Sequence, residues 1–266
     1  MDWNKTKTIF IIVFSILNVF LFSLYLNRYN DAIDLEVLSD ATIEDRLFQD
    51  NITVPKMDID IKEASFVSGN THNFILEELE KLPNQTITVD GLKLTSTFDK
   101  SISITEENTV EKLVRENVLR GNSYGLWKTD EENKSATFFQ KVNNRFVYYN
   151  QNATLVVYWN DQQELVRYEQ KILDNLEDYD EDKTLLSPIQ AIKVLYDGGL
   201  LKPDSIVKEI KLGYSRLIEL TETQVFAPTW HILVELPDGT REDHFVNAIE
   251  GRIVEIQKNQ EQAVVK

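Results

Sequence analysis

Histidine is the side chain best suited to proton transfer and metal binding near neutral pH, and this chain has only three. Two of them, His231 and His244, lie in alternating segments joined by Asp238-Gly239, a dipeptide that favours a hairpin turn. A two-residue loop there would set the two rings diagonally across the hairpin, about 7 to 8 Å apart. One metal ion cannot bridge that distance without a carboxylate between the rings. We therefore expect two exposed sheet histidines and no metal site.

Carboxylates dominate the charge, with 44 acidic and 28 basic residues and a net charge of −16. Three aspartates have the opening spacing of a calcium-binding loop: Asp178, Asp180 and Asp182. Lys183 replaces the glycine that such a loop needs, and Ile189 stands where a bidentate glutamate should be. We expect a solvated acidic hinge over residues 176–186. Among so many carboxylates a catalytic pair cannot be singled out, so a glycosidase acting on cell-wall polymer stays open as an alternative.

Other catalytic patterns are missing from the sequence. It contains no G-x-S-x-G elbow, no H-E-x-x-H helix and no phosphate-binding glycine loop, and the absence of cysteine excludes a thiol nucleophile. A surface this acidic repels nucleic acid and anionic lipid headgroups. We expect no catalytic residues, no metal, no cofactor and no nucleic-acid partner.

Aromatic side chains gather in the middle of the chain, where we expect strands. The cluster comprises Tyr148, Tyr149, Tyr158, Trp159 and Tyr168. Side chains alternate along a strand, so some of these rings must point outward unless both faces of the sheet are covered. Exposed rings would form a protein-binding patch. Packing between a sheet and a helix is the commoner reason for such a run.

An uncharged stretch over residues 8–26 dominates the N-terminus. As a helix it would be about 28 Å long, which matches the hydrocarbon core of a bilayer. A cleaved signal peptide would have a shorter apolar core followed by small residues at the cleavage site, whereas bulky Leu24, Tyr25 and Leu26 end this one. We predict an uncleaved transmembrane helix.

The charges flanking this helix predict its orientation. Lys5 and Lys7 precede it, Arg28 follows it, and the rest of the chain is acidic. By the positive-inside rule, residues 1–7 stay in the cytoplasm and the C-terminal part lies outside the cell membrane.

Most of the polar side chains of the predicted helix share one stripe, at the spacing of a helix-pairing seam. The stripe comprises Thr8, Ile11, Ser15, Asn18, Phe22 and Tyr25. Asn18 would sit near the middle of the bilayer, where its amide needs a hydrogen-bond partner. That partner is either another helix or the backbone of its own helix.

The remaining chain divides by composition into parts that predict an α+β protein. We expect a single transmembrane helix followed by two related extracytoplasmic domains, each a helix plus an antiparallel β-meander. The expected parts are a cytoplasmic N-terminus 1–7, a transmembrane helix 8–26, a juxtamembrane linker 27–62, a first domain 63–175, the acidic hinge 176–186, a second domain 187–258 and a tail 259–266.

Local signals predict the elements of these domains. We expect helices over 41–48, 73–82, 106–120 and 188–196, the last with Ser187 as its N-cap and Pro188 as its first residue. Strands are expected over 86–89, 92–98, 136–142, 145–150, 153–159, 164–173, 206–212, 216–222, 229–236, 241–247 and 252–257. With a two-residue turn at Asp238-Gly239, Trp230, Ile232, Val234 and Leu236 would share a face with Phe245.

Three stretches carry a resemblance to a known family. They are the start M-D-W-N-K-T-K-T-I-F (1–10), the segment T-I-E-D-R-L-F-Q-D-N-I-T-V-P (42–55) and the C-terminal run from Pro228 to Val254. Together with the single predicted span, they resemble the YycI (WalI) family of Gram-positive Firmicutes over the whole length. The C-terminal run is also similar to the pattern of PepSY-like modules.

The resemblance implies a YycH/YycI-like fold and no catalysis. It implies a membrane-anchored accessory protein that associates with a sister protein, YycH (WalH), and with the sensor histidine kinase WalK. Through these contacts it would modulate two-component signalling and, through it, cell-wall metabolism. A cell-wall-binding module or a low-activity wall hydrolase is the alternative.

Overall fold

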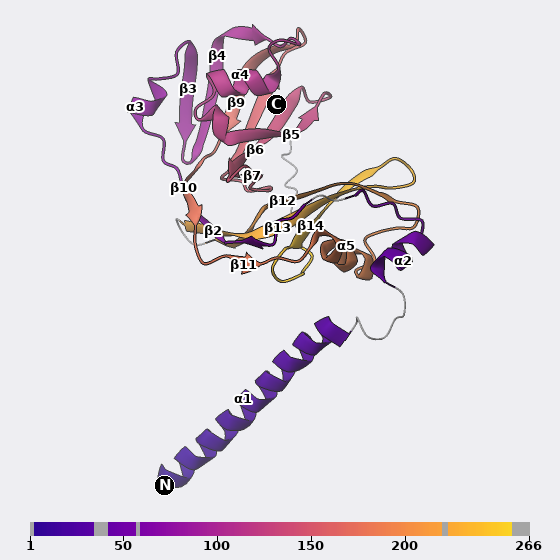
Figure 1. Cartoon of the computed structure of the whole chain (residues 1–266). Coiled ribbons are helices and arrows are strands. Elements are labelled where there is room, and N and C mark those ends of the chain that lie inside the picture. The colour runs from indigo at the N-terminus through magenta and orange to yellow at the C-terminus, as the bar shows by residue number, and fades with distance from the viewer. Residues whose placement is uncertain (1–2, 35–41, 57–58, 220–222, 257–266) are drawn as a thin grey trace. The chain divides into compact units, whose positions relative to one another are not determined.

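The computed structural model describes residues 3–34, 42–56, 59–219 and 223–256. It divides into two compact units, Met1–Asn51 and Ile52–Lys266 (Figure 1). We call them the anchor unit and the outer unit, after the locations predicted for them from the sequence.

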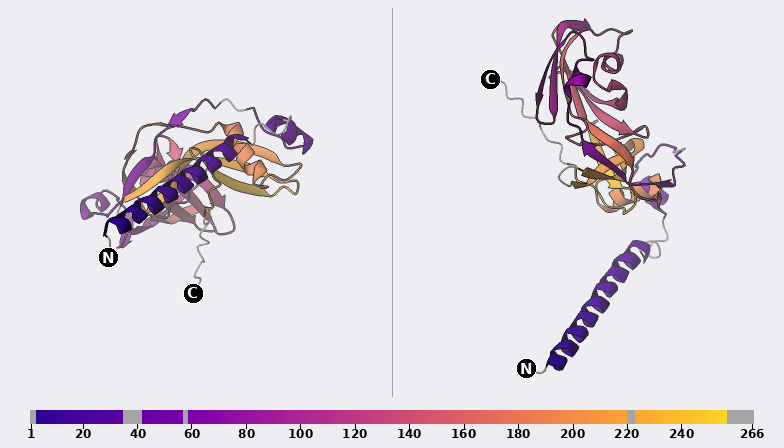
Figure 2. Two further views of the ribbon diagram at one scale, coloured as in Figure 1. Left: turned by 90° about the horizontal axis from the view of Figure 1, so that it is seen from below. Right: turned by 90° about the vertical axis from the view of Figure 1, so that its left-hand side faces the viewer.

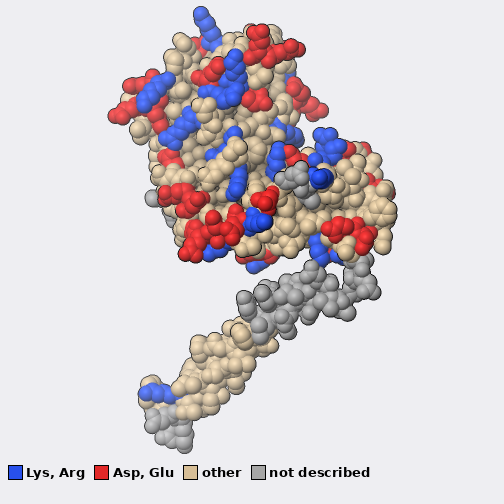
Figure 3. Space-filling model, viewed as in Figure 1, with Lys and Arg blue, Asp and Glu red and all other residues tan. Residues whose placement is uncertain are grey.

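The anchor unit contains two helices. Helix α1 (Trp3–Asp34) includes the expected span and continues past it into the expected linker. Its segment Lys7–Leu24 has a mean hydropathy of 2.2, so α1 is long and apolar enough to cross a bilayer. In its described stretch, basic atoms lie near the N-terminal end and the rest of the visible surface is uncharged (Figure 3). Helix α2 (Ile43–Gln49) begins at a capping box in which Thr42 and Asp45 each bind the other's backbone N–H.

The outer unit contains two large antiparallel sheets, of which the first is seven-stranded. Its main strand order is β3-β4-β9-β8-β6-β5, with the short β7 beside β6. The strands are β3 (Gln85–Asp90), β4 (Lys93–Ser103), β5 (Tyr124–Asp130), β6 (Ser135–Val142), β7 (Arg145–Phe146), β8 (Thr154–Trp159) and β9 (Glu164–Gln170). Helix α4 (Val110–Asn117) packs on one face through Leu113 and Val114 (Figures 1 and 2).

The second sheet has the order β10-β2-β13-β12, and β14 pairs with the remaining part of β13. Its strands are β2 (Val67–Thr71), β10 (Leu173–Asp178), β12 (Ile206–Glu219), β13 (Thr223–Glu235) and β14 (Arg241–Asn247). Helix α5 (Pro188–Asp197) begins at the predicted Ser187 cap, closed by Gln190 into a capping box. The short strands β1 (Glu63–Ala64) and β11 (Lys183–Thr184) pair with each other, and the single turn α3 (Leu76–Leu79) and the 3₁₀ turn η1 (Gly121–Ser123) complete the unit.

The sheets do not follow the expected division into residues 63–175 and 187–258. Strands β2 and β10 lie inside the expected first domain, yet they pair with each other, and β2 also pairs with β13 of the second sheet. The first sheet is therefore inserted between β2 and β10. Part of the expected acidic hinge is also strand, because β10 extends to Asp178 and β11 covers Lys183–Thr184. A separate helix on each sheet agrees with the expected α+β class, whereas kinship between two domains stays a prediction.

Several elements differ from expectation for local reasons. The helix expected over 106–120 starts later, because Thr105 accepts a hydrogen bond from the Asn108 N–H in a turn and Thr109 becomes the N-cap. The helix expected over 73–82 shrinks to α3. Strand β5 was not predicted, and β12 is one continuous strand where two were expected.

The register of the β13–β14 hairpin corrects the predicted faces. Glu235 pairs with Arg241, which makes the connection longer than the two-residue turn assumed from Asp238-Gly239. His231 consequently lies opposite Phe245, and Ile232 lies opposite His244. Since a slip of one residue turns every side chain of a strand over, Phe245 shares a face with His231 and not with Trp230. The two histidines lie on opposite faces, and His231 is buried, so the expected pair of exposed histidines is wrong.

The two sheets share an apolar core. Val142, Val147 and Ala153 of the first sheet and its connections pack with second-sheet residues that include Tyr214 and Phe226. The backbones also meet, because the Tyr148 N–H donates to the Tyr214 carbonyl at 2.8 Å. Gly213 lies at this approach, where an added Cβ would overlap the Tyr148 ring and lie 2.6 Å from the Phe146 carbonyl oxygen.

We expect Gly213→Ala to lower the free energy of unfolding by about 1 to 3 kcal/mol, the usual cost of overpacking a filled core. Chemical denaturation of the purified chain measures this loss. The matched control is Gly198→Ala, whose Cβ would overlap the end of the Ile253 side chain, which can move aside, and would lie 3.2 Å from the Val194 carbonyl oxygen, farther than the 2.6 Å that separates a Cβ at position 213 from the Phe146 oxygen. Equal losses in the two variants would contradict the close approach.

Candidate functional site at the crossing between the sheets

The predicted helix-pairing stripe lies on α1, where the described side chains are exposed. They are Thr8, Ile11, Ser15, Asn18 and Phe22; the side chain of Tyr25 lies outside the described residues. The Asn18 Nδ2 donates to the Phe14 carbonyl at 2.9 Å, the second of the two partners that the sequence allowed. An Asn amide has two N–H donors and an acceptor oxygen, so this bond uses only part of its capacity. Helix pairing through Asn18 stays a prediction.

The five predicted aromatic residues do not form one patch. Trp159 and Tyr168 are buried in the core under α4, and burial raises the pKa of the Tyr168 hydroxyl to about 12. Tyr148 and Tyr149 belong to a different cluster. Tyr158 is half-buried on the opposite side of its strand from Trp159, where the Arg167 guanidinium lies 3.8 Å from its ring centre. The structure thus separates the five residues, and most of them pack inside the protein.

The second aromatic cluster lies where the two sheets meet and contains rings that sequence reasoning did not join. Trp127 and Phe139 stack with centroids 5.1 Å apart, and Tyr148 lies 5.1 Å from Phe245 of the second sheet. His231 stacks on Phe245 at 5.1 Å, and its Nε2 lies 2.8 Å from an Asp243 carboxylate oxygen. These contacts join the sheets and hold the imidazole away from solvent.

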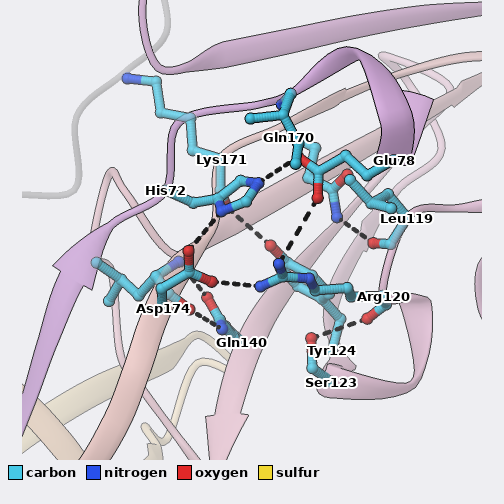
Figure 4. Close-up of polar contacts among 12 residues, drawn as sticks. His72, Glu78, Leu119, Arg120, Ser123, Tyr124, Gln140, Gln170, Lys171 and Asp174 are labelled. Atoms are coloured by element: carbon cyan, nitrogen blue, oxygen red, sulfur yellow. Dashed lines mark hydrogen bonds and ion pairs between the residues drawn. The ribbon is translucent and has the colours of Figure 1, made fainter.

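The candidate site lies where the chain passes from one sheet to the other. It comprises His72 just after β2, Glu78 on α3, Arg120 between α4 and η1, and Asp174 on β10 (Figure 4). The two passages run side by side, because the His72 N–H donates to the Ile172 carbonyl at 3.0 Å. We call these four residues the crossing cluster.

Charges of opposite sign alternate around the cluster. His72 Nδ1 lies 2.5 Å from Asp174 Oδ2, and His72 Nε2 lies 2.5 Å from Glu78 Oε1. Arg120 forms an ion pair with Asp174 and lies 3.7 Å from Glu78 Oε2. Because ionised carboxylates only accept hydrogen bonds, both contacts are hydrogen bonds only when both ring nitrogens of His72 carry a proton. In that form two cations balance two anions around a ring whose side chain is 7% exposed.

Local backbone conformation positions Arg120. Its φ of 52° is left-handed, and Gly121 follows it with no room for a side chain against Val114 of α4. Burial raises the pKa of the Asp174 carboxyl, but the hydrogen bonds and charges of His72 and Arg120 outweigh it and hold that pKa below its ordinary value. Asp174 therefore stays ionised near neutral pH.

Neutral hydrogen bonds brace the same crossing. The buried Gln140 side chain donates to the Leu173 carbonyl at 2.8 Å and accepts from the Leu173 N–H at 2.9 Å. The Tyr124 hydroxyl donates to the Lys171 carbonyl at 2.7 Å, and Gln170 Nε2 donates to the Leu119 carbonyl at 2.7 Å. Side chains thus bind the backbone immediately before and after the passage into β10 (Figure 4).

The arrangement is suited to holding a charge. His72 has no hydroxyl beside it to activate, because its two nitrogens face carboxylates. Among residues 3–34, 42–56, 59–219 and 223–256, no three His, Asp or Glu side chains are placed to hold a metal ion. Sequence reasoning missed this cluster, since Asp174 lies 102 positions from His72 and no spacing rule links them.

We expect Gln140→Leu to destabilise the chain by about 1 to 3 kcal/mol for each Leu173 backbone group left buried and unpaired. Denaturant titration at neutral pH measures the loss, and exposed Gln162→Leu is the control. If the two variants lose the same stability, the Gln140 side chain does not stabilise the crossing.

Acid should weaken the crossing through Asp174. Because the folded pKa of Asp174 is depressed, its ionised form stabilises the fold above the ordinary value of 3.8, and this contribution disappears as pH falls through the lower folded pKa. Wild-type stability should therefore fall between about pH 5 and pH 2, and Asp174→Asn should fall less steeply. Unfolding titrations across this range measure both slopes, with exposed Glu80→Gln as the control for one lost charge. Unchanged slope in Asp174→Asn would contradict the pairing.

Comparison with known proteins identifies the family. No curated protein matches the chain significantly. Among solved structures, an uncharacterized protein from Eubacterium rectale shares 14% identity with a TM-score of 0.50, covering 78% of this chain and 92% of that one. The YpeB C-terminal domain of Bacillus megaterium shares 11% identity with a TM-score of 0.38, covering 83% and 98%. The first likeness concerns the fold alone. The family model described as "YycI protein" matches residues 33–249, so the chain belongs to the YycI family.

Proposed function

We propose that this chain is a membrane-anchored, non-catalytic regulator that binds a YycH-type sister protein and a WalK-type sensor histidine kinase. Family membership carries the proposal, because the YycI family implies a regulator in the WalK system and is not known as a family of enzymes. In the proposal, α1 spans the cell membrane with its N-terminus in the cytoplasm, and the outer unit lies outside. Its contacts shift the kinase between states and so modulate the signalling that controls cell-wall metabolism.

The character of α1 supports a role in assembly as well as anchoring. A single apolar helix suffices to hold the protein in the membrane, and anchoring alone needs no polar residue in it. Asn18 nevertheless places an amide near the bilayer centre with hydrogen-bonding capacity left after its contact with the Phe14 carbonyl. A second helix packed along the stripe would use that capacity. We therefore propose that α1 pairs with a partner's helix.

Co-purification from native membranes in mild detergent tests the proposal. Full-length tagged protein should recover a histidine kinase and a second single-span protein. Asn18→Leu should lower that recovery about threefold to thirtyfold, because an interhelical hydrogen bond contributes about 0.6 to 2 kcal/mol. Ser23→Leu is the matched control, since Ser23 is a polar residue of the same helix outside the stripe.

The outcomes separate the parts of the proposal. Equal recovery with both variants would remove the Asn18 contact from the assembly and leave the outer unit to form it. Absence of any kinase from the wild-type sample would overturn the regulatory proposal. In that case, sedimentation of the full chain with purified peptidoglycan would distinguish a wall-binding module.

A further inference from the structure

The His72 ring is enclosed by groups from every element around it. Asp174 faces Nδ1 from β10, and Glu78 faces Nε2 from α3. Arg120 reaches both carboxylates from the turn after α4. The Phe74 ring lies perpendicular to the imidazole at a centroid distance of 4.9 Å. A change in the charge of His72 therefore alters contacts to three separate parts of the outer unit, namely β10, α3 and the turn after α4.

Loss of one proton cannot be accommodated in this arrangement. A neutral imidazole has one N–H donor and one bare acceptor nitrogen, whereas both of its neighbours are acceptors. One of the two His72 contacts must then break. The cluster would also change from balanced charge to a net negative charge in a partly buried place, which is unfavourable.

The contact to Glu78 is the one that should give way. Asp174 belongs to a strand paired with β2 and is also held by Arg120. Glu78 belongs to α3, a single helical turn, and its distance to Arg120 is the longest in the cluster. Glu78 also accepts a hydrogen bond from the Ile75 N–H at 3.1 Å, which closes the start of that turn. A displaced Glu78 would therefore loosen α3 itself.

We propose that His72 is a proton-operated latch on α3: the imidazolium holds the turn against the crossing, and deprotonation releases it. The turn bears two exposed apolar side chains, Ile75 and Leu76, at 54% and 72% exposure. Release changes how these side chains are presented to a partner. The latch rests on the crossing cluster, and only its use as an input from outside the membrane rests on the proposed function.

The first test reads the protons on His72. The full chain, labelled at histidine with ¹³C and ¹⁵N and held in nanodiscs, gives signals from only three residues. The variants His231→Gln and His244→Gln assign the other two. The latch requires His72 to carry protons on both nitrogens at neutral pH and to lose one as the pH rises. A neutral His72 at neutral pH would overturn it.

The second test reads α3 by hydrogen exchange, followed by mass spectrometry and corrected for the intrinsic effect of pH. Amides over residues 73–82 should exchange at least about tenfold faster once His72 has lost its proton, the effect of losing one charged hydrogen bond. His72→Gln has one donor group for two carboxylates, so its α3 should exchange quickly at every pH. Flat exchange of the wild type through the His72 titration would overturn the latch.

Asp174→Asn provides the decisive comparison because an asparagine at this position can form hydrogen bonds with a neutral His72 ring. The amide that replaces the Asp174 carboxylate can donate to a bare Nδ1 while its carbonyl still accepts from Arg120, which leaves the Nε2–H of His72 for Glu78. In this variant α3 should stay protected across the pH range, although one charge has been removed. If amide exchange over residues 73–82 accelerates with rising pH in Asp174→Asn as it does in the wild type, that acceleration does not come from His72. All three measurements use the chain without partners, so they stand or fall separately from the recovery of a kinase.

Discussion

The outer unit depends on the place where its chain passes between two sheets and returns. The two passages touch through the hydrogen bond from the His72 N–H to the Ile172 carbonyl, and side chains from several elements converge on them. A slip in either passage would shift β2 against β10, whose pairing is already interrupted between Asp174 and Glu177. Because side chains alternate along a strand, such a slip would exchange the faces of β10. The polar contacts at the crossing therefore fix the register from which the second sheet is built.

Apolar and polar contacts contribute differently to the joining of the two sheets. The rings around Tyr148 and Phe245 bury a large area and supply the nondirectional part of the stability. The crossing cluster contributes less to net stability, since burying charges costs free energy that their attraction only partly returns. Its contribution is directional, because each carboxylate is held by two cations at defined places. The apolar core brings the sheets together, and the cluster specifies how the chain enters and leaves them.

Local signals in the sequence predicted local structure well. The Ser187 cap with Pro188 marked the start of α5, and the uncharged run 8–26 marked the apolar part of α1. Apart from shifted helix ends such as the start of α4, the larger errors arose where distant residues decide the outcome. The face on which Phe245 lies depends on the register of the β13–β14 pair, which is shifted by one residue from the register that a two-residue turn would give. The membership of β2 and β10 in the second sheet depends on pairing between segments that the whole first sheet separates in the sequence. The crossing cluster was missed for the same reason, since its members come from four separate segments of the chain.

The insertion has a consequence for the history of the fold. Thr71 pairs with Leu173, so β2 and β10 are antiparallel neighbours whose adjacent ends carry the entire first sheet. In topological terms the first sheet occupies the loop of a β-hairpin. Closing that hairpin with a short turn would leave the pairing of β10, β2 and β13 in place. The second sheet can thus be viewed as a host into which the first was grafted, and relatives are expected to differ most in what this hairpin carries.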